Sequence, residues 1–442
     1  MKPFKFFLVT DTHYFEPSLG CSGEAFDDYM KNEMYYLAES SEIVKATFKK
    51  IAEDTEVDTV IIPGDLSKDG EKESHKSFVK ELKKLKEAGK KVFVITAGHD
   101  YNDHPRGYKG KDFVPVEGTT LDDLYDLYYE FGYSEALSVD RQTLSYVAEV
   151  AEGVRMIAFN CDSADNVKGT IDERMLSWAK EQIDKAKEDG CFIFAINHYP
   201  IIPSVPVFDL IGDAHIKNWR KVASFLADNG VHLAMTGHMH IQSINEFYSE
   251  SGNKFVDICT SCLVGSPAKY RKVTVEDEET VKVESIPVPE FRENTDGIST
   301  QRFFDSRAET AAVNRINRAL NGGDGIVKSL KGVAKGNFNN KTLGQIGRML
   351  CIKVDSELKD KKFTTFAGEI ARDIFLGDQP YTKGTPEYET VSRVLKRFHP
   401  VISKVEKKLT KDGVTPNLAE MVLKTIGNDK GWSDNDAVIK LK

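Results

Sequence analysis

Aspartate and histidine side chains gather at five points of this 442-residue chain, each directly after a short apolar run. The five segments are Asp11-Thr12-His13, Gly64-Asp65, Gly98-His99-Asp100, His198 and Gly237-His238-Met239-His240. Carboxylate oxygens and imidazole nitrogens suit Mn, Fe or Zn, and the lack of a thiol in the set argues against a closed structural zinc site. One such segment alone is weak evidence for a metal site, because a histidine at a strand end is usually structural. Five of the ten histidines lie in these segments, which favours a catalytic metal site.

The spacing within the segments suits a pair of cations. Asp11 and His13 are two residues apart on an extended tip, so both side chains can face one cation, and His238 and His240 repeat this spacing. Asp65 has two oxygens and can bridge two cations about 3.5–4 Å apart, the separation at which a metal pair holds the attacking and leaving oxygens of a displacement at phosphorus. The pattern therefore indicates metal-assisted chemistry on a phosphate ester.

Buried strands must position these segments. Short β-branched or aromatic runs alternate with helical patterns over the first 240 residues, which is typical of an α/β domain. The expected strands are 4–10, 59–63, 92–96, 144–150, 156–160, 192–197 and 232–236, and the expected helices are 42–53, 73–88, 174–188 and 219–229. Each segment follows one of these strands, and ligands converge at the carboxyl ends of strands in such sheets. Residues 241–287 continue as strands, with a hairpin around the acidic turn 276–279.

The order of the segments resembles the motifs of the calcineurin-like metallophosphoesterase superfamily, which run D-x-H, GD, GNH[DE], H and GHxH. The resemblance covers residues 1 to about 285 and implies an α/β fold, a four-layer α/β/β/α sandwich. It implies a dinuclear centre of two divalent or iron-type ions, Mn, Fe or Zn. The implied ligands are Asp11, His13 and His240 for the first ion, Asp65 as the bridge, and His198 and His238 for the second.

The same resemblance implies two catalytic residues. His99 falls on the histidine that contacts the phosphate and helps to protonate the leaving oxygen, and Asp100 falls on the carboxylate that orients it. Histidine has a reference pKa of about 6.5, so it can deliver a proton near neutral pH. Paired cations lower the pKa of a shared water toward neutrality. The implied reaction is hydrolysis of a phosphate mono- or diester by a metal-bound hydroxide, with His99 as general acid.

One position departs from the family pattern. Gly98 stands where the family has an asparagine that binds the second ion, so this ion loses an oxygen ligand. We expect the second site to be weakened by Gly98. Water, Asn102, Asp103 or His104 are candidate replacements, and another possibility is that the second ion binds only together with phosphate.

The character of the sequence changes near residue 295. From residue 299 onward it reads as helices, expected at 302–320, 341–353, 366–376, 388–408 and 418–426. Residues 1–300 carry a net charge of −18 and residues 301–442 a net charge of +9. We therefore expect a metallophosphoesterase domain over 1–295 and a mostly helical C-terminal domain over 296–442. We expect that domain to be a cap over the site, a module that binds a partner, or an interface, which includes an interface between copies of the chain.

Composition excludes several classes of protein. Hydrophobic residues make up 40% and charged residues 29%, as in ordinary globular proteins. The sequence shows neither a membrane span nor a signal peptide, and its six cysteines are sparse, so we expect a cytoplasmic protein with reduced thiols. The C-x-x-C of Cys259 and Cys262 is expected to be structural rather than a redox or zinc motif. An acidic body is a poor surface for duplex nucleic acid.

The neighbours of Asp65 narrow the substrate. Gly64-Asp65 is followed by Leu66-Ser67-Lys68-Asp69-Gly70, without the arginine of the G-D-x-V-D-R-G segment of Ser/Thr protein phosphatases or the tyrosine of the G-D-x-x-Y segment of purple acid phosphatases. A small-molecule phosphodiesterase or phosphatase is the expected type. The alternative is a binding or scaffold protein with weak or no turnover that works through its helical region; Gly98 favours it, and the retained ligands oppose it.

Overall fold

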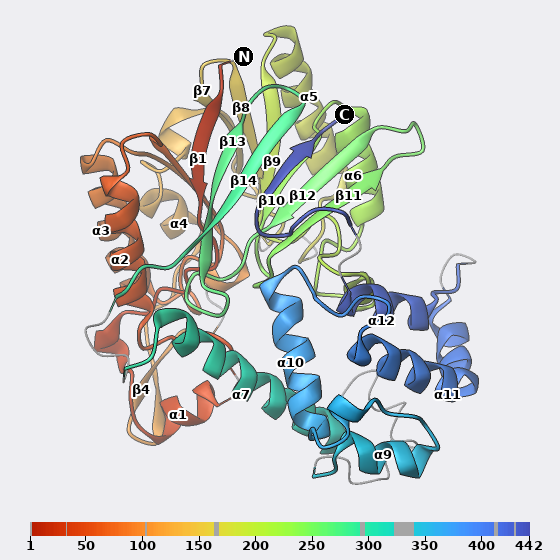
Figure 1. Cartoon of the computed structure of the whole chain (residues 1–442). Coiled ribbons are helices and arrows are strands. Elements are labelled where there is room, and N and C mark those ends of the chain that lie inside the picture. The colour runs from red at the N-terminus through yellow and green to blue at the C-terminus, as the bar shows by residue number, and fades with distance from the viewer. Residues whose placement is uncertain are drawn as a thin grey trace.

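Two β-sheets form the centre of the molecule in this computed structural model, which describes residues 2–31, 33–101, 104–162, 168–291, 297–321, 340–410, 414–427 and 430–442. The strands of the first sheet are β1 (Phe4–Leu8), β2 (Thr59–Pro63), β3 (Lys91–Ile95), β13 (Lys269–Val275), β14 (Thr280–Pro287) and β15 (Ala437–Lys440). Those of the second are β6 (Ala136–Asp140), β7 (Ser145–Ala151), β8 (Val154–Phe159), β9 (Phe192–Asn197), β10 (Leu233–Thr236), β11 (Ser243–Tyr248) and β12 (Lys254–Cys259). The strand orders are β15-β14-β13-β1-β2-β3 and β11-β12-β10-β9-β8-β7-β6 (Figure 1).

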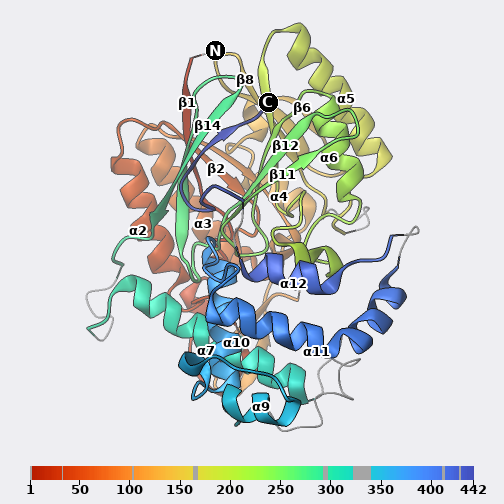
Figure 2. The same cartoon turned by 45° about the vertical axis from the view of Figure 1, so that its right-hand side comes forward.

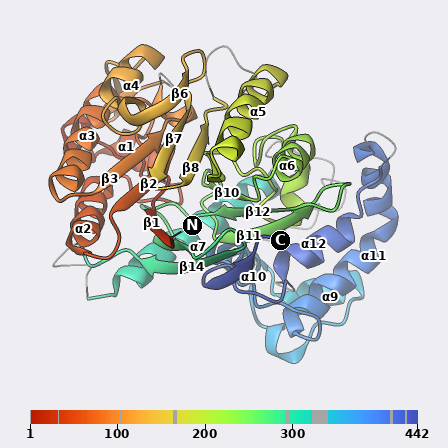
Figure 3. The same cartoon turned by 90° about the horizontal axis from the view of Figure 1, so that it is seen from above.

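Helices cover the outer face of each sheet. The first sheet carries α2 (Ser40–Glu53) and α3 (Lys72–Glu87), and the second carries α5 (Glu173–Glu188) and α6 (Trp219–Asp228) (Figure 3). These helices bury one apolar stripe each, as their sequences predict. One apolar core lies between the sheets and under α2 and α3, and a second lies between the second sheet and α5 and α6. The predicted four-layer α/β/β/α class is confirmed.

Several short elements were not expected from the sequence. They are α1 (Glu24–Met30), α4 (Leu121–Leu127), the edge strand β6 and the hairpin of β4 (Arg106–Lys109) and β5 (Asp112–Pro115). The helices have two turns and the hairpin strands four residues each, too short for a periodic pattern to stand out.

The helices of the C-terminal region lie below the sheets as drawn in Figure 1, and Figure 2 shows them from a second side. They are α7 (Thr300–Asn321), α9 (Leu343–Leu350), α10 (Phe363–Leu376), α11 (Pro386–Leu409) and α12 (Leu418–Ile426). The predicted domain boundary near 295 falls outside the described residues. Within the described parts of the chain, no helix has the length and apolar character that crossing a bilayer requires.

The end of the chain differs from the expected helical domain. After α12 the chain returns to the first sheet, where β15 pairs antiparallel with β14 and Ile439 lies opposite Val281. Ile439 is buried in the same apolar core as Val281. Residues 437–440 therefore belong to the sheet, and the described rest of this segment is mostly helical, as expected. A four-residue strand gives too little sequence pattern to be recognised.

Arg271 on β13 connects the ends of the two sheets to this C-terminal segment through hydrogen bonds. Its guanidinium is fully buried. It donates to the carbonyl of Cys259 at 2.9 Å and the hydroxyl of Thr260 at 3.0 Å on one side, and to the carbonyls of Asp434 at 3.0 Å and Asn435 at 3.2 Å on the other. Burial lowers the pKa of Arg271 to about 10, which leaves it charged at neutral pH.

Replacing Arg271 by methionine is expected to lower the free energy of unfolding by about 3 kcal/mol or more, because several buried carbonyls lose their donor at once. Urea denaturation measures this. Lys272→Met on the same strand is the control, since Lys272 pairs with the exposed Glu56, and about 1 kcal/mol or less is expected there. Equal losses in the two variants would contradict a special role for Arg271.

Candidate metal centre

Loops at the carboxyl ends of parallel strands carry all the predicted ligands. Asp11 and His13 follow β1, Asp65 follows β2, His198 follows β9, and the loop with His238 and His240 follows β10. Strands β1, β2 and β3 run parallel in one sheet, and β8, β9, β10 and β12 run parallel in the other. Because the two sheets face each other, their loops meet at one end of the sandwich.

The backbone of these loops is unusual. Five of the predicted ligands have left-handed conformations, with φ of 52° at Asp11, 35° at His13, 49° at Asp65, 66° at His238 and 57° at His240. Residues other than glycine seldom adopt such angles, which cost about 1–3 kcal/mol each and cluster at functional sites. The surrounding hydrogen bonds hold them: the amide of His238 donates to Asp11 Oδ2 at 3.0 Å and that of His13 to the Asp65 carbonyl at 3.0 Å.

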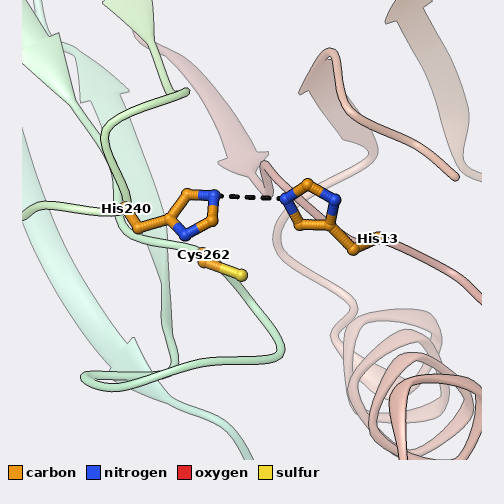
Figure 4. Close-up of side chains that lie close together, drawn as sticks. All are labelled: His13, His240 and Cys262. Atoms are coloured by element: carbon orange, nitrogen blue, oxygen red, sulfur yellow. Dashed lines mark hydrogen bonds between the residues drawn. The ribbon is translucent and has the colours of Figure 1, made fainter. Parts of the chain in front are cut away.

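Three side chains form a first cluster. His13 Nε2 lies 3.1 Å from His240 Nε2, so the two rings point at one place (Figure 4), and Asp11 Oδ1 lies 3.2 Å from His240 Nε2. Two ligand atoms that sit about 2.1 Å from one cation at a right angle are about 3.0 Å apart. The observed separations therefore match ligands of a single ion.

Three more side chains form a second cluster from Asp65, His198 and His238. Asp65 Oδ2 lies 3.0 Å from His198 Nε2. His198 Nδ1 donates to the Pro63 carbonyl at 2.9 Å, which turns the buried Nε2 toward the cluster and Asp65. His238 Nε2 donates to the Asp213 carbonyl at 2.7 Å, which leaves Nδ1 available to the centre. Such contacts fix ring orientation in metal sites.

Asp65 lies between the two clusters. Its Oδ2 is 3.0 Å from His198 Nε2 and 3.9 Å from His13 Nε2, and its Oδ1 accepts from the backbone amide of His99 at 3.2 Å. Burial would raise the pKa of Asp65, but the charges of His198 and His99 hold it well below its usual value. Asp65 is thus an ionised carboxylate between two groups of histidine side chains, and its role as a bridging ligand stays a prediction.

The histidines differ in protonation before any cation binds. Burial lowers the pKa of His13 and of His238 to about 3, so both rings are neutral. Burial would also lower the pKa of His198, but the carboxylates of Asp65 and Asp11 outweigh it and raise this pKa to about 10. A cation entering the second cluster must therefore displace a proton from His198.

Zinc binding at pH 6 is expected to release about one proton, from His198, because the free protein holds this proton below pH 10 and the complex does not. For the same reason zinc affinity should rise about tenfold per pH unit. Calorimetry in two buffers of different ionisation enthalpy measures the release. At pH 6 a zinc-bound water with a pKa of about 7 contributes little. Zinc binding without proton release would contradict the predicted state of His198.

The surroundings of His99 differ in part from the sequence prediction. Its Nδ1 donates to the Lys68 carbonyl at 2.6 Å and lies 3.1 Å from Asp69 Oδ1. Asp100 instead accepts from the backbone amides of Leu66 and Ser67 through Oδ1 and of Ala97 through Oδ2. The prediction that Asp100 orients the His99 ring is therefore wrong: Asp100 is fully buried under the loops, and Asp69 holds the ring.

The surroundings of Gly98 also hold residues that the sequence did not single out as ligands. The amide of Gly98 donates to Asp162 Oδ2 at 2.8 Å, and the Lys168 side chain lies against Gly98. Of the replacements considered for the missing asparagine, Asn102 and Asp103 lie outside the described residues. His104 is exposed.

Both cysteines of the C-x-x-C motif anchor loops of the site. Cys259 Sγ donates to the Gly237 carbonyl at 3.2 Å and Cys262 Sγ to the Asp11 carbonyl at 3.1 Å. Cys262 lies next to His13 and His240 (Figure 4). Burial raises the pKa of Cys262 well above its usual value, so it remains a thiol. The cysteines are free, in keeping with a structural role.

The C-terminal helices pack beside the loops of the centre. The loop around Met239 and Ile241 forms an apolar cluster with Ile374 and Phe375 of α10. The amide of Gln242 donates to the Phe375 carbonyl at 3.1 Å. On the other side, His13 stacks on Tyr35 with ring centroids 4.8 Å apart, and the neighbouring Tyr36 packs on α7. Sequence spacing could not reveal Tyr35, because it lies far from any motif.

Comparison with known proteins identifies the family of the chain. A family model described as calcineurin-like phosphoesterase matches residues 4–242, more than half of the chain. Among solved structures, the chain is similar to a dimetal phosphatase from Danio rerio, with 12% identity and a TM-score of 0.46 over 65% of this chain and 97% of that one. No curated protein matches the sequence.

Two further solved structures are longer than the matched region. A purple acid phosphatase from yellow lupin seeds has 12% identity and a TM-score of 0.37, over 66% of this chain and 52% of that one. A 5′-nucleotidase precursor from Thermus thermophilus has 12% identity and a TM-score of 0.38, over 71% and 59%. The chain thus spans little more than half of each. The family match over residues 4–242 shows that the chain belongs to the calcineurin-like phosphoesterase family and is a metal-dependent phosphoester hydrolase.

Proposed function

We propose that this hydrolase acts on small phosphate mono- or diesters, with two cations held around Asp65 and with His99 as general acid. One observation carries the proposal: two clusters of ligand atoms, one around His13 and His240 and one around His198, meet at the carboxylate of Asp65. The donor set of carboxylates and imidazoles fits Mn, Fe or Zn.

The residues fit a pair of ions on independent grounds. His198 Nε2 is buried, lies 3.0 Å from Asp65 Oδ2 and points at the cluster. The Asp11 carboxylate is buried as well, and the histidine charges hold its pKa at about 2 although burial would raise it. Bound divalent ions in such a site lower the pKa of a water and neutralise the phosphate oxygens.

The chain's own groups position and protonate the substrate. The His99 ring is 37% exposed while its partner Asp69 is 6% exposed, so the ring is held at Nδ1 from inside and remains partly accessible to solvent. With Nδ1 donating inward, Nε2 is the atom that would transfer a proton. This arrangement suits a general acid that serves the leaving oxygen.

The residues after Asp65 bear on the substrate. Asp69 stands where the G-D-x-V-D-R-G segment has its arginine, and it contacts the His99 ring. The neighbouring Lys68 has a buried ammonium that contacts Asp69 and lies 4.5 Å from the centre of the Tyr29 ring. A phosphoprotein substrate is correspondingly disfavoured, and the alternative of an inactive scaffold retains only Gly98 in its support.

The test is hydrolysis by the metal-loaded protein. We expect turnover of p-nitrophenyl phosphate or bis-p-nitrophenyl phosphate with Mn, Fe or Zn, and the ratio of the two rates ranks monoester against diester. Failure to hydrolyse either ester with each of these ions would overturn the proposal.

A further inference from the structure

Gly98 leaves room that another side chain fills. A Cβ built on Gly98 would lie 2.9 Å from Lys168 Nζ, 3.2 Å from Lys168 Cε and 3.2 Å from Asp162 Oδ2. The 2.9 Å separation is shorter than real Cβ contacts, so an asparagine at position 98 would require the flexible end of Lys168 to move away. Lys168 therefore occupies the space in which that asparagine would begin, and the two side chains compete for it.

This space borders the second cluster. Gly98 directly precedes His99, whose amide donates to Asp65 Oδ1. Burial raises the pKa of Asp162, and the charges of His198 and Lys168 oppose that rise, which places Asp162 within electrostatic reach of both the cluster and the ammonium. The residue Lys168 is exposed, so its stem begins at the surface and its ammonium reaches inward toward Gly98.

Asp162 is poised to hold the ammonium there. It is 1% exposed, its Oδ2 accepts from the Gly98 amide, and the Tyr199 hydroxyl interacts with the same carboxylate. A buried carboxylate costs free energy unless charges and donors compensate it. The ammonium of Lys168 is the nearby charge that can do so, and it has three N–H donors, more than Asp162 needs.

An ammonium cannot replace the asparagine as a metal ligand, because it has no lone pair and repels cations. It can bind a phosphate oxygen, and lysine often does so as a point charge. Resting on the function proposed above, we propose that Lys168, admitted by Gly98 and held by Asp162, binds the phosphate group of the substrate beside the second cation. Gly98 thereby exchanges a metal ligand for a phosphate ligand.

Binding of inorganic phosphate to the metal-loaded protein tests this role. Lys168→Met is expected to raise the Kd for phosphate at least about tenfold, the effect of one charge-assisted hydrogen bond, with metal content unchanged. Lys168→Arg should retain most of the affinity. The matched control is Lys221→Met on α6, an exposed lysine that contacts Glu173, and it should leave the Kd unchanged.

For the substitution Gly98→Asn, which restores the family's residue, we expect tighter metal binding and no further role for Lys168. It restores an amide oxygen and displaces Lys168, so the weaker of the two Mn sites should tighten in an Mn titration followed by electron paramagnetic resonance. In this background Lys168→Met should change the Kd for phosphate by less than about twofold, since the ammonium no longer reaches the site.

Two results would overturn the inference. One is an unchanged Kd for phosphate in Lys168→Met, and the other is loss of bound metal in that variant, which would make Lys168 a structural residue. Phosphate binding is measured without turnover, so this inference and the proposed function can fail separately. If the protein hydrolyses esters but Lys168→Met leaves the Kd for phosphate unchanged, only the role of Lys168 is lost. If Lys168→Met raises the Kd but the protein hydrolyses neither ester, only the proposed reaction is lost.

Discussion

Replacing Asp65 by asparagine is expected to lower kcat/KM about a thousandfold or more. The carboxylate lies between His13 and His198 and is ionised, so the substitution removes the charge that both clusters share. Metal ions contribute several kcal/mol to the stabilisation of the transition state, and each 1.36 kcal/mol is a factor of ten in rate. The variant should also retain at most one ion per chain.

Metal analysis together with steady-state kinetics measures both effects. Asp58→Asn is the matched control, because Asp58 is an exposed carboxylate that immediately precedes β2, at the opposite end of the strand from Asp65. It should keep both ions and full activity. Retention of two ions and normal turnover by Asp65→Asn would remove the bridging role from Asp65.

Replacing His99 by glutamine is expected to lower kcat by about a hundredfold to ten-thousandfold, the usual contribution of a general acid, while the metal content stays unchanged. The loss should depend on the leaving group. The kcat for an alkyl phosphate should fall by the full factor, because its alkoxide leaving group must be protonated. The kcat for p-nitrophenyl phosphate should fall much less, because this ester releases a stable anion. Equal losses for the two esters would mean that His99 binds phosphate without donating a proton.

The variants Asp69→Asn and Asp100→Asn distinguish the roles of the two carboxylates near His99. Because Asp69 contacts Nδ1, its loss should weaken the general acid and lower kcat about tenfold. The decrease should depend on the leaving group in the same direction as in His99→Gln. Asp100→Asn should instead lower the free energy of unfolding by about 1–3 kcal/mol, since an amide nitrogen would face a backbone N–H that Asp100 now accepts. The reverse pattern would restore Asp100 as the orienting residue.

Much of the catalytic fold follows from local sequence pattern. The strands at 59–63 and 192–197 and the helix at 418–426 lie where apolar runs and periodicity predict them, and other boundaries shift by one to three residues. The six metal-binding candidates could be grouped because each follows a predicted strand, and strand ends converge whatever the loops contain. The residues that the structure adds depend on loop geometry. The family motif points to Asp100, the neighbour of His99 in sequence, and only the path of the loop after β2 brings Asp69 to Nδ1.

The role of Lys168 is beyond sequence reasoning for a related reason. It lies 70 residues from Gly98 in the chain, and one surface lysine among many gives no signal. The sequence shows that position 98 lacks a side chain, whereas the residue that fills the space, Lys168, is found only in the folded structure.

The strand β15 has a consequence for how the first sheet folds. Until residues 437–440 pair with it, β14 is an open edge with unpaired N–H and C=O groups, and Arg271 lacks the carbonyls of Asp434 and Asn435. Because about 150 residues separate β14 from β15, this edge closes through a long-range contact, and a folding intermediate without it exposes an edge that invites aggregation.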